Sequence, residues 1–379
     1  MLTATREQRL GELRAQCRTM LIEAERDGIA TRSQPHPALS PLAWHLGHVF
    51  FVETYWLREV LFGNTNATAD WQDLYFPEFC PKDQRTARLP STEAILDWTR
   101  TLEHDNSTWW AQAQGSGHRL MADGYLPDFL IQHYAQHLET MTMADYQARA
   151  QDAPEGAVLR DAADPTPLMT AVAAGESPVG TDSITAYDNE QPAHTVDLAA
   201  FRIARHAVTN AQWLAFMQDG GYHQDRYWTT DGLAWRDHAG TECPQHWRPH
   251  PDGGWVSANP ADPLLPAAPV HGLCAHEADA FASWMNARLP HEHEWETARQ
   301  GDHLADVGQV WEWSANPLFA YPGFRSFPYE GYSNPWFDGA HRVLRGASRH
   351  TRPDIHRSSF RNFYPATHRH VFAGLRLAN

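Results

Sequence analysis

Apolar residues recur every three to four positions through much of the first 150 residues, which predicts amphipathic helices. Two sites have the features of helix starts: Ser40 is followed by a proline, and Ser91 is followed by a threonine and a glutamate. The predicted helices cover about 6–26, 40–61, 91 onward and 128–149. Four helices of this length favour an all-α four-helix bundle over residues 1–150.

The pattern changes after residue 150. Residues 151–170 are rich in Ala, Asp, Gly and Pro and have no periodicity, which indicates a linker. Over 171–379, short apolar segments alternate with long stretches rich in Trp, Gly, Pro and Asn. Short helices are predicted at about 209–219, 276–287 and, after Pro290, at 292–298. This second part is typical of an α+β domain dominated by loops.

Charge and composition restrict the possible partners and the compartment. The net charge of −16 argues against nucleic acid, because such a surface repels phosphate. No apolar run is long enough to cross a bilayer, and the first residues lack the apolar core of a signal peptide. The four cysteines show no CxxC spacing, which argues against disulfides and cysteine-ligated zinc. We therefore expect a cytoplasmic protein that binds neither nucleic acid nor membrane.

Histidine spacing predicts a metal site. His133 and His137 are four residues apart in a predicted helix, so their imidazoles share one face. With 23 histidines, roughly one HxxxH pair is expected by chance, and a second pair in the chain contains a proline that excludes a helix. A third imidazole would come from the second helix, where His48 and its neighbour His45 lie on the same face. Imidazoles alone do not distinguish Fe from Mn or Zn.

The second half of the chain resembles the formylglycine-generating-enzyme-like (sulfatase-modifying-factor) family, which implies a C-type-lectin-like α+β fold over 171–379. The resemblance rests on these segments in the family order: 188–194 (DNEQPAH), 208–213 (VTNAQW), 277–281 (EADAF), 288–296 (RLPHEHEWE), 308–313 (GQVWEW), 344–348 (LRGAS) and 374–377 (GLRL). The first half resembles the DinB-type four-helix bundle, through 44–48 (WHLGH) and the later HxxxH.

The two domains in this order resemble the ergothioneine-biosynthetic sulfoxide synthases, which are non-haem iron enzymes related to the ovothiol and selenoneine synthases. The resemblance implies an oxidative coupling that needs Fe(II) and O2. In that reaction the sulfur of cysteine or γ-glutamylcysteine joins the imidazole C2 of Nα-trimethylhistidine and is oxidised to a sulfoxide. By motif position, the family's metal ligands correspond to His48, His133 and His137.

The same resemblance implies substrate-binding residues. Gln136 and Asn362 fall where the family holds the histidine-type substrate, and Phe363 and Tyr364 are candidate aromatic faces for its trimethylammonium group. The family places an arginine for the carboxylate of the thiol substrate in the loop before the third helix. The candidates there are Arg85 and Arg88, whose guanidinium groups suit bidentate binding.

Departures from the family pattern bear on the thiol. Members that use γ-glutamylcysteine have a proton-donating tyrosine where this chain has Leu318, and an acid where it has Tyr364. Both replacements favour cysteine. The candidates for the catalytic proton donor are then Tyr321, the next family tyrosine, and Tyr75 in the first domain. Ser348 stands where a formylglycine-generating enzyme would keep a reactive cysteine, which argues against that reaction.

Other functions fit the same residues. A selenium donor, another thiol, histidine itself or a different ring carbon would give a selenoneine- or ovothiol-type synthase. A thiol dioxygenase side activity is conceivable, because proton supply decides between coupling and simple thiol oxidation. A metal-dependent module that binds a ligand without turnover is the non-enzymatic alternative. The sequence does not predict the oligomeric state.

Overall fold

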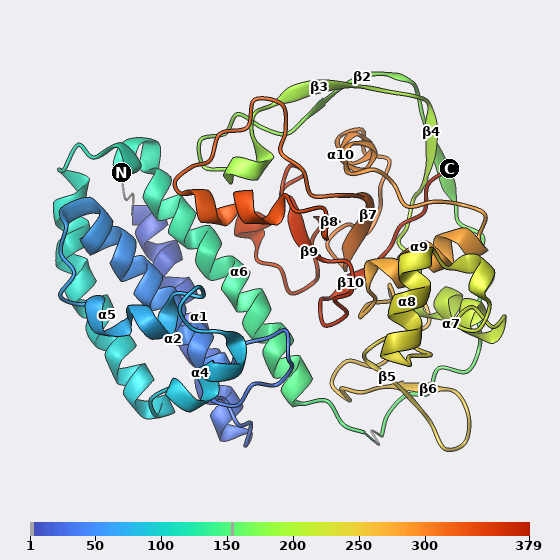
Figure 1. Ribbon diagram of the computed structural model, residues 1–379, viewed down its shortest axis with the longest axis horizontal. Helices are drawn as coiled ribbons and strands as arrows, with labels where there is room; N and C mark the ends of the chain where they lie inside the picture. Colours follow the sequence, from blue (N-terminus) through green and yellow to red (C-terminus); the bar gives the residue numbers. More distant parts are fainter. Residues whose placement is uncertain (1–3, 153–154) are drawn as a thin grey trace. The chain divides into compact units, whose positions relative to one another are not determined.

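The computed structural model describes residues 4–152 and 155–379 (Figure 1). The chain forms two compact units: a helical unit that runs to Arg149 and includes Thr351–Ile355, and a second unit made of Ala150–His350 and His356–Asn379. The sequence pattern did not predict that the short segment Thr351–Ile355 would pack with the helices. Among the described residues, no helix has the length and apolarity needed to cross a membrane.

The helical unit contains the four long helices that the periodicity predicts. They are α1 (Ala4–Arg26), α2 (Leu42–Thr54), α5 (Thr92–Gln114) and α6 (Tyr125–Ala148), and α2 continues as a π-helical segment η1 (Tyr55–Val60). Helix α1 packs against α6, and α2 packs against both α5 and α6. Every side chain of α2 is buried, so this helix lies at the centre of the unit.

Helix starts follow the local sequence. Ser91 caps α5, because its side chain accepts a hydrogen bond from the backbone N–H of Ala94. Helix α6 begins three residues earlier than expected, and Pro127 lies in its first turn, where a backbone N–H has no partner within the helix. The apolar stripe of α1 faces inward, as predicted: Leu10, Leu13, Cys17, Leu21 and Ala24 are all buried.

Short helical segments complete the unit: η2 (Ala69–Trp71), α3 (Gln72–Tyr75), α4 (Lys82–Arg88), η3 (Arg119–Gly124) and η8 (Pro353–Ile355). The prediction that Arg85 and Arg88 lie in a loop is wrong, because both belong to α4. The segment has only seven residues, too few to produce a periodic pattern, and it follows Pro81. Arg85 is buried in the unit, whereas Arg88 is exposed.

The second unit is an α+β fold with many loops, as the sequence predicts. Its helical segments are η4 (Asp188–Glu190), α7 (Asn210–Gln218), η5 (Asp225–Tyr227), α8 (Thr230–Ala239), α9 (Ala275–Trp284), α10 (Glu292–Gln300), η6 (Glu330–Tyr332) and η7 (Asn334–Trp336). Helix α8 was not predicted, because only one of its residues, a glycine, is fully buried and it has no apolar stripe.

The sheets of this unit are small. Strands β1 (Met169–Val172) and β4 (Phe201–Ala204) pair, as do β2 (Gly175–Val179) and β3 (His194–Leu198), and β5 (Trp247–Pro249) and β6 (Trp255–Ser257). The largest sheet has the order β10-β7-β8-β9, from Ala373–Gly374, Trp311–Pro317, His341–Gly346 and Asn362–Pro365. Strand β10 is parallel to β7, and the other pairs are antiparallel. Helix α10 packs against β7 and β8.

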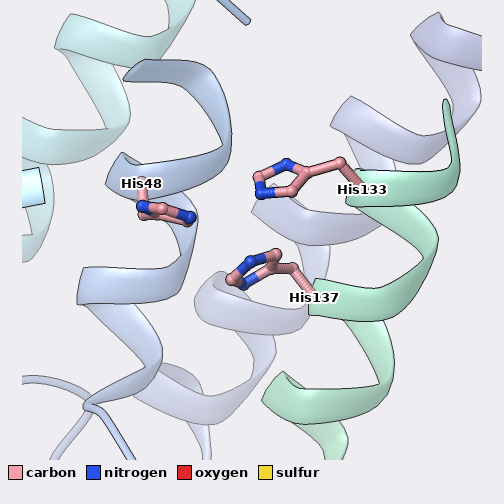
Figure 2. A group of neighbouring side chains, drawn as sticks. All are labelled: His48, His133 and His137. Carbon is pink, nitrogen blue, oxygen red and sulfur yellow. The ribbon is translucent and has the colours of Figure 1, made fainter. Parts of the chain in front are cut away.

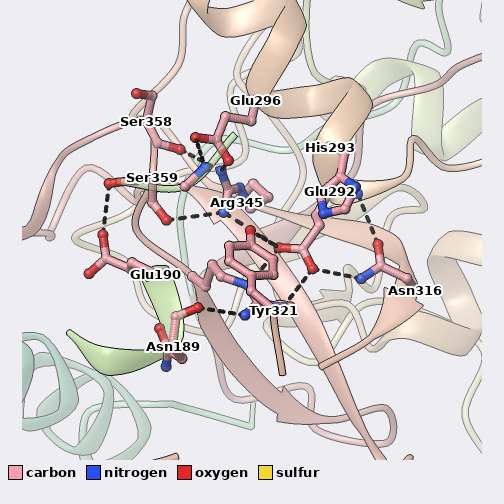
Figure 3. Close-up of polar contacts among 12 residues, drawn as sticks. Asn189, Glu190, Glu292, His293, Glu296, Asn316, Tyr321, Arg345, Ser358 and Ser359 are labelled. Carbon is pink, nitrogen blue, oxygen red and sulfur yellow. Dashed lines mark hydrogen bonds and ion pairs between the residues drawn. The ribbon is translucent and has the colours of Figure 1, made fainter. Parts of the chain in front are cut away.

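Buried ion pairs connect distant segments of the second unit (Figure 3). Glu292 on α10 is fully buried and accepts two hydrogen bonds from Arg361, at 2.8 and 2.7 Å. Arg345 on β8 pairs with Glu296 at 2.6 Å and donates to the carbonyl of Ser359. The two ion pairs join residues 49 and 69 positions apart in sequence, so the network fixes the fold where regular secondary structure is sparse.

Candidate metal centre

Three imidazoles from two helices converge inside the helical unit (Figure 2). His48 comes from α2, and His133 and His137 come from α6, where the four-residue spacing places them on one face. One nitrogen of each ring lies within 4.8 Å of the corresponding atom of the other two. The ring centroids are 4.5 to 5.2 Å apart. Among the described residues, this is the only group of three or more His, Cys, Asp or Glu with such convergence.

The backbone and a tryptophan hold His48 in place. Its Nδ1 lies 2.8 Å from the carbonyl oxygen of Tyr75, and a carbonyl can only accept, so this Nδ1 carries the proton. The Nε2 lone pair therefore remains available for a metal ion. The indole of Trp44, one turn earlier on α2, stacks on the imidazole at 4.5 Å and is itself held by a hydrogen bond to the Leu74 carbonyl. The ring orientation is thus set before any ion binds.

The other two ligand candidates have different surroundings. The Nδ1 atom of His137 lies 3.0 Å from the Nδ1 atom of His45, in hydrogen-bonding contact. The Nδ1 atom of His133 is inaccessible to solvent and has no partner among the described residues. His45, the alternative to His48 on sequence grounds, is therefore a neighbour of the three-histidine cluster and is not one of its members.

His48 is buried, and His133 and His137 are half-buried. Desolvation keeps the three imidazoles neutral. Desolvation lowers the pKa of His48 to about 4, although the hydrogen bond to the Tyr75 carbonyl acts in the opposite direction. Burial, followed by the nearby imidazoles, also lowers the pKa of His133 and His137 well below the ordinary value. A neutral imidazole has the lone pair that coordination requires. Three neutral nitrogen donors on fixed helices fit a divalent transition metal ion.

The candidate substrate residues of the helical unit differ in exposure. Gln136 is half-buried on α6, between the two histidines in sequence. Arg85 is engaged within the protein: it donates to the Cys80 carbonyl at 2.9 Å and to the Ser40 hydroxyl, and its guanidinium lies 3.7 Å from the ring centre of Trp44. Burial lowers the pKa of Arg85 to about 10. Arg88 is exposed on the last turn of α4.

Tyr75 contributes its backbone carbonyl to the site, and its side chain is fully buried. The ring stacks on Trp98 at 5.4 Å, and the hydroxyl has no hydrogen-bond partner among the described residues. This hydroxyl packs against Gly47 so closely that a Cβ added to Gly47 would lie 2.1 Å from it. Sequence reasoning missed Gly47. Its only signal was a glycine inside an apolar helix, which marks a close approach by another group.

The remaining candidates lie in the second unit. Asn362, Phe363 and Tyr364 are half-buried on β9, paired with β8, and the ring of Tyr364 contacts His368 and His370. Tyr321 is buried, and its hydroxyl lies 3.4 Å from Glu292 Oε2, with the Arg361 guanidinium 4.0 Å from its ring centre. Tyr321 therefore belongs to the ion-pair network of this unit.

The fold and the site define a class of protein: a helical unit with a three-histidine cluster that could hold a metal ion, joined to an α+β unit. The family model of the sulfatase-modifying factor enzyme 1-like domain matches residues 155–306. A formylglycine-generating enzyme of Thermomonospora curvata is 34% identical, but over only 35% of this chain and 48% of its own length.

Two relatives match along nearly their whole length. The hercynine oxygenase of Mycolicibacterium smegmatis is 32% identical, covering 93% of this chain and 94% of its own. The hercynine oxygenase of Mycobacterium tuberculosis is 31% identical, covering 96% of both. The chain belongs to the hercynine oxygenase family, in agreement with its resemblance to the ergothioneine-biosynthetic sulfoxide synthases.

Proposed function

We propose that the protein is a non-haem, Fe(II)- and O2-dependent sulfoxide synthase of the ergothioneine type. The reaction would join the sulfur of a thiol to the imidazole of a histidine derivative. The histidine derivative is Nα-trimethylhistidine, since hercynine is the compound in the names of the long-matching relatives. The first unit would be the DinB-type bundle that holds the iron.

The observation that carries this proposal is the convergence of His48, His133 and His137 in a chain with these relatives. Three neutral imidazoles would leave a divalent ion its full charge and leave coordination positions for other ligands. When bound, iron would supply the redox chemistry with O2 and a common point of attachment for both substrates. The chain's part is to present three donors from two helices. The Tyr75 carbonyl and Trp44 orient His48, and His45 contacts His137.

The substrate residues are those that the family resemblance implies, and the chemistry of their side chains suits the role. Gln136 and Asn362 carry amides that can bind the histidine derivative, and Phe363 and Tyr364 offer aromatic faces to a trimethylammonium group, which cannot donate hydrogen bonds. Of the two arginines, Arg88 is the better placed for a carboxylate. It is exposed, whereas Ser40, the Cys80 carbonyl and Trp44 already engage Arg85.

Cysteine is the favoured thiol. Leu318, where a proton-donating tyrosine would serve a γ-glutamylcysteine enzyme, is buried and apolar, so it cannot transfer a proton. Tyr364, where an acid would bind the γ-glutamyl amine, carries no negative charge at neutral pH. Both replacements remove interactions specific to γ-glutamylcysteine.

The candidate proton donors are Tyr321 and Tyr75. Burial raises the pKa of both phenols, so each hydroxyl keeps its proton at neutral pH and is a weaker acid than an exposed tyrosine. Glu292 next to Tyr321 raises that pKa further. Replacing each tyrosine with phenylalanine removes the hydroxyl and keeps the ring, and the two variants serve as each other's matched control.

The test is anaerobic loading with Fe(II), followed by incubation with Nα-trimethylhistidine and each thiol under air and mass spectrometry of the products. We expect a C–S sulfoxide adduct with cysteine, a smaller amount with γ-glutamylcysteine, and none with His133→Ala. The adduct mass and ring position identify a different donor or carbon. Absence of any adduct with every pair contradicts the proposal. Loss of product in Y321F but not Y75F, or the reverse, identifies the proton donor.

A further inference from the structure

We propose that His45 is a positioning residue that accepts a hydrogen bond from His137 Nδ1 and thereby presents His137 Nε2 to the metal ion. The inference rests on the proposed metal site and deepens it. His45 is buried on α2, three residues before His48, and its Nδ1 atom lies 3.0 Å from His137 Nδ1. It touches no substrate in this account and acts only through the ligand.

The contact between the two nitrogens requires that one donates and the other accepts. A neutral imidazole carries its proton on one nitrogen only. Because the Nδ1 atom of His137 points to His45, the nitrogen of His137 that remains for a metal is Nε2. Coordination uses the Nε2 lone pair, so the proton of His137 must be on Nδ1 and must be donated to His45.

The direction of this hydrogen bond assigns the tautomer of His45. Its Nδ1 must be the acceptor, so its proton is on Nε2, an atom that is buried and has no partner among the described residues. An unpartnered buried N–H costs free energy. The chain therefore keeps a costly group beside the site, which a purely structural role does not explain, since an apolar side chain of similar shape would avoid the cost.

The three ligand candidates differ in what contacts their second nitrogen. His48 Nδ1 meets the backbone carbonyl of Tyr75, and His133 Nδ1 has no partner among the described residues. His137 alone meets a side chain, so its outer contact can be removed by substitution. A hydrogen bond to the nitrogen that does not bind the metal fixes the ring orientation and the tautomer of a ligating histidine. Loss of this hydrogen bond typically weakens metal affinity by about 10- to 100-fold.

Two substitutions separate hydrogen bonding from packing. In His45→Asn the side-chain oxygen Oδ1 is bonded to Cγ, as Nδ1 is in histidine. It can therefore occupy the position of Nδ1 and accept the same hydrogen bond. In His45→Leu the side chain has a similar extent but cannot accept a hydrogen bond. We measure Co(II) binding by anaerobic titration, the ligand-field absorption of the Co(II) protein, and the thermal midpoint of the metal-free protein.

We expect H45L to bind Co(II) about 10- to 100-fold more weakly than the wild type, with a changed ligand-field spectrum. We expect H45N to bind with affinity and spectrum close to wild type. The metal-free midpoints of wild type and H45L should be similar, because Leu removes an unpartnered polar atom from the interior.

Equal Co(II) affinity in H45L and wild type overturns the inference and leaves the proposed function intact. Equal weakening in H45N and H45L also overturns it, because packing alone would then explain the effect. If H45N does not fold, an H45L affinity and spectrum that match wild type still overturn the inference, and a weakened, altered site with an unchanged metal-free midpoint supports it. Failure of wild type to bind Co(II) contradicts both the inference and the proposed metal site.

Discussion

Both units bury polar and ionisable side chains, but they use them in opposite ways. In the second unit, the buried carboxylate of Glu292 is paired with Arg361, and that of Glu296 is paired with Arg345. In the helical unit, three imidazoles face one another, and His48 presents an acceptor to its neighbours. Two hydrogen-bond acceptors that face each other do not stabilise each other. Buried groups that satisfy one another indicate structure, whereas imidazoles that converge without donors between them fit a cation.

The helical unit contains both arrangements within two turns of α2. Glu53 is fully buried five residues after His48, and its carboxylate accepts hydrogen bonds from Arg14, Trp110 and Tyr134. The contrast therefore does not depend on which unit a residue belongs to. It depends on whether donors surround the acceptor.

The largest expected effect comes from removing a converging imidazole. His133→Ala should weaken Co(II) or Fe(II) binding by more than the roughly 100-fold upper range for an outer contact, and should abolish product formation. The metal-free protein should keep its thermal midpoint within a few degrees. Equilibrium dialysis gives the affinity and calorimetry the midpoint. A variant that loses its fold instead of its metal would place His133 with the structural groups.

Breaking the buried Glu292–Arg361 ion pair should lower the stability of the protein and leave its metal affinity unchanged. Glu292→Gln leaves Arg361 buried without its counter-charge, which should destabilise the protein by about 3–5 kcal/mol. Co(II) affinity of the folded variant should not change. Denaturant unfolding measures the stability. A stable E292Q with weakened metal binding would contradict the division between the two regions.

Lowering the pH should weaken the same ion pair and reduce the stability of the folded protein. Burial alone would raise the pKa of Glu292, but the charges of Arg361 and Arg345 lower it to about 2. Because the folded pKa lies below the ordinary value, the stabilisation is complete above about pH 4.5 and is lost as the pH falls toward 2. We expect wild type to lose about 3 kcal/mol from this group over that range. The free energy of unfolding of E292Q should fall less steeply with decreasing pH than that of the wild type. Equal slopes for the two proteins would contradict the assignment of this pH dependence to Glu292.

The smallest expected effect tests Tyr134, which adjoins His133 in sequence but donates to Glu53 at 2.8 Å. Tyr134→Phe removes one of several hydrogen bonds to that carboxylate, which should cost about 1–2 kcal/mol of stability. Metal affinity should match wild type, as unfolding and Co(II) titration will show. A large loss of affinity would mean that the Glu53 network and the histidines act as one site.

Long periodic helices were predictable because each turn repeats the same burial. The serine cap at Ser91 was visible for a similar reason, since its contact lies within one turn. Helix α4 and helix α8 were not, because the first is too short for a pattern and the second has no apolar stripe. Pairings such as Arg361 with Glu292 join residues 69 positions apart, which no local signal reports.

The site shows the same limit. The HxxxH spacing predicted that His133 and His137 share a face, because helix geometry alone decides this. The separate contacts of His45 and His48 depend on how α2 packs against α6, which the sequence does not encode locally. Neither the Tyr75 carbonyl on His48 nor the packing of Tyr75 on Gly47 could be foreseen, since both require a chain reversal between the segments.

The most direct test of the central claim is anaerobic equilibrium dialysis of Fe(II) against wild type and His137→Ala, with metal quantified per protein chain. We predict one Fe(II) per chain for wild type and no bound iron for H137A under the same conditions. Wild type that retains no iron, or H137A that retains as much as wild type, would contradict the assignment of the three histidines.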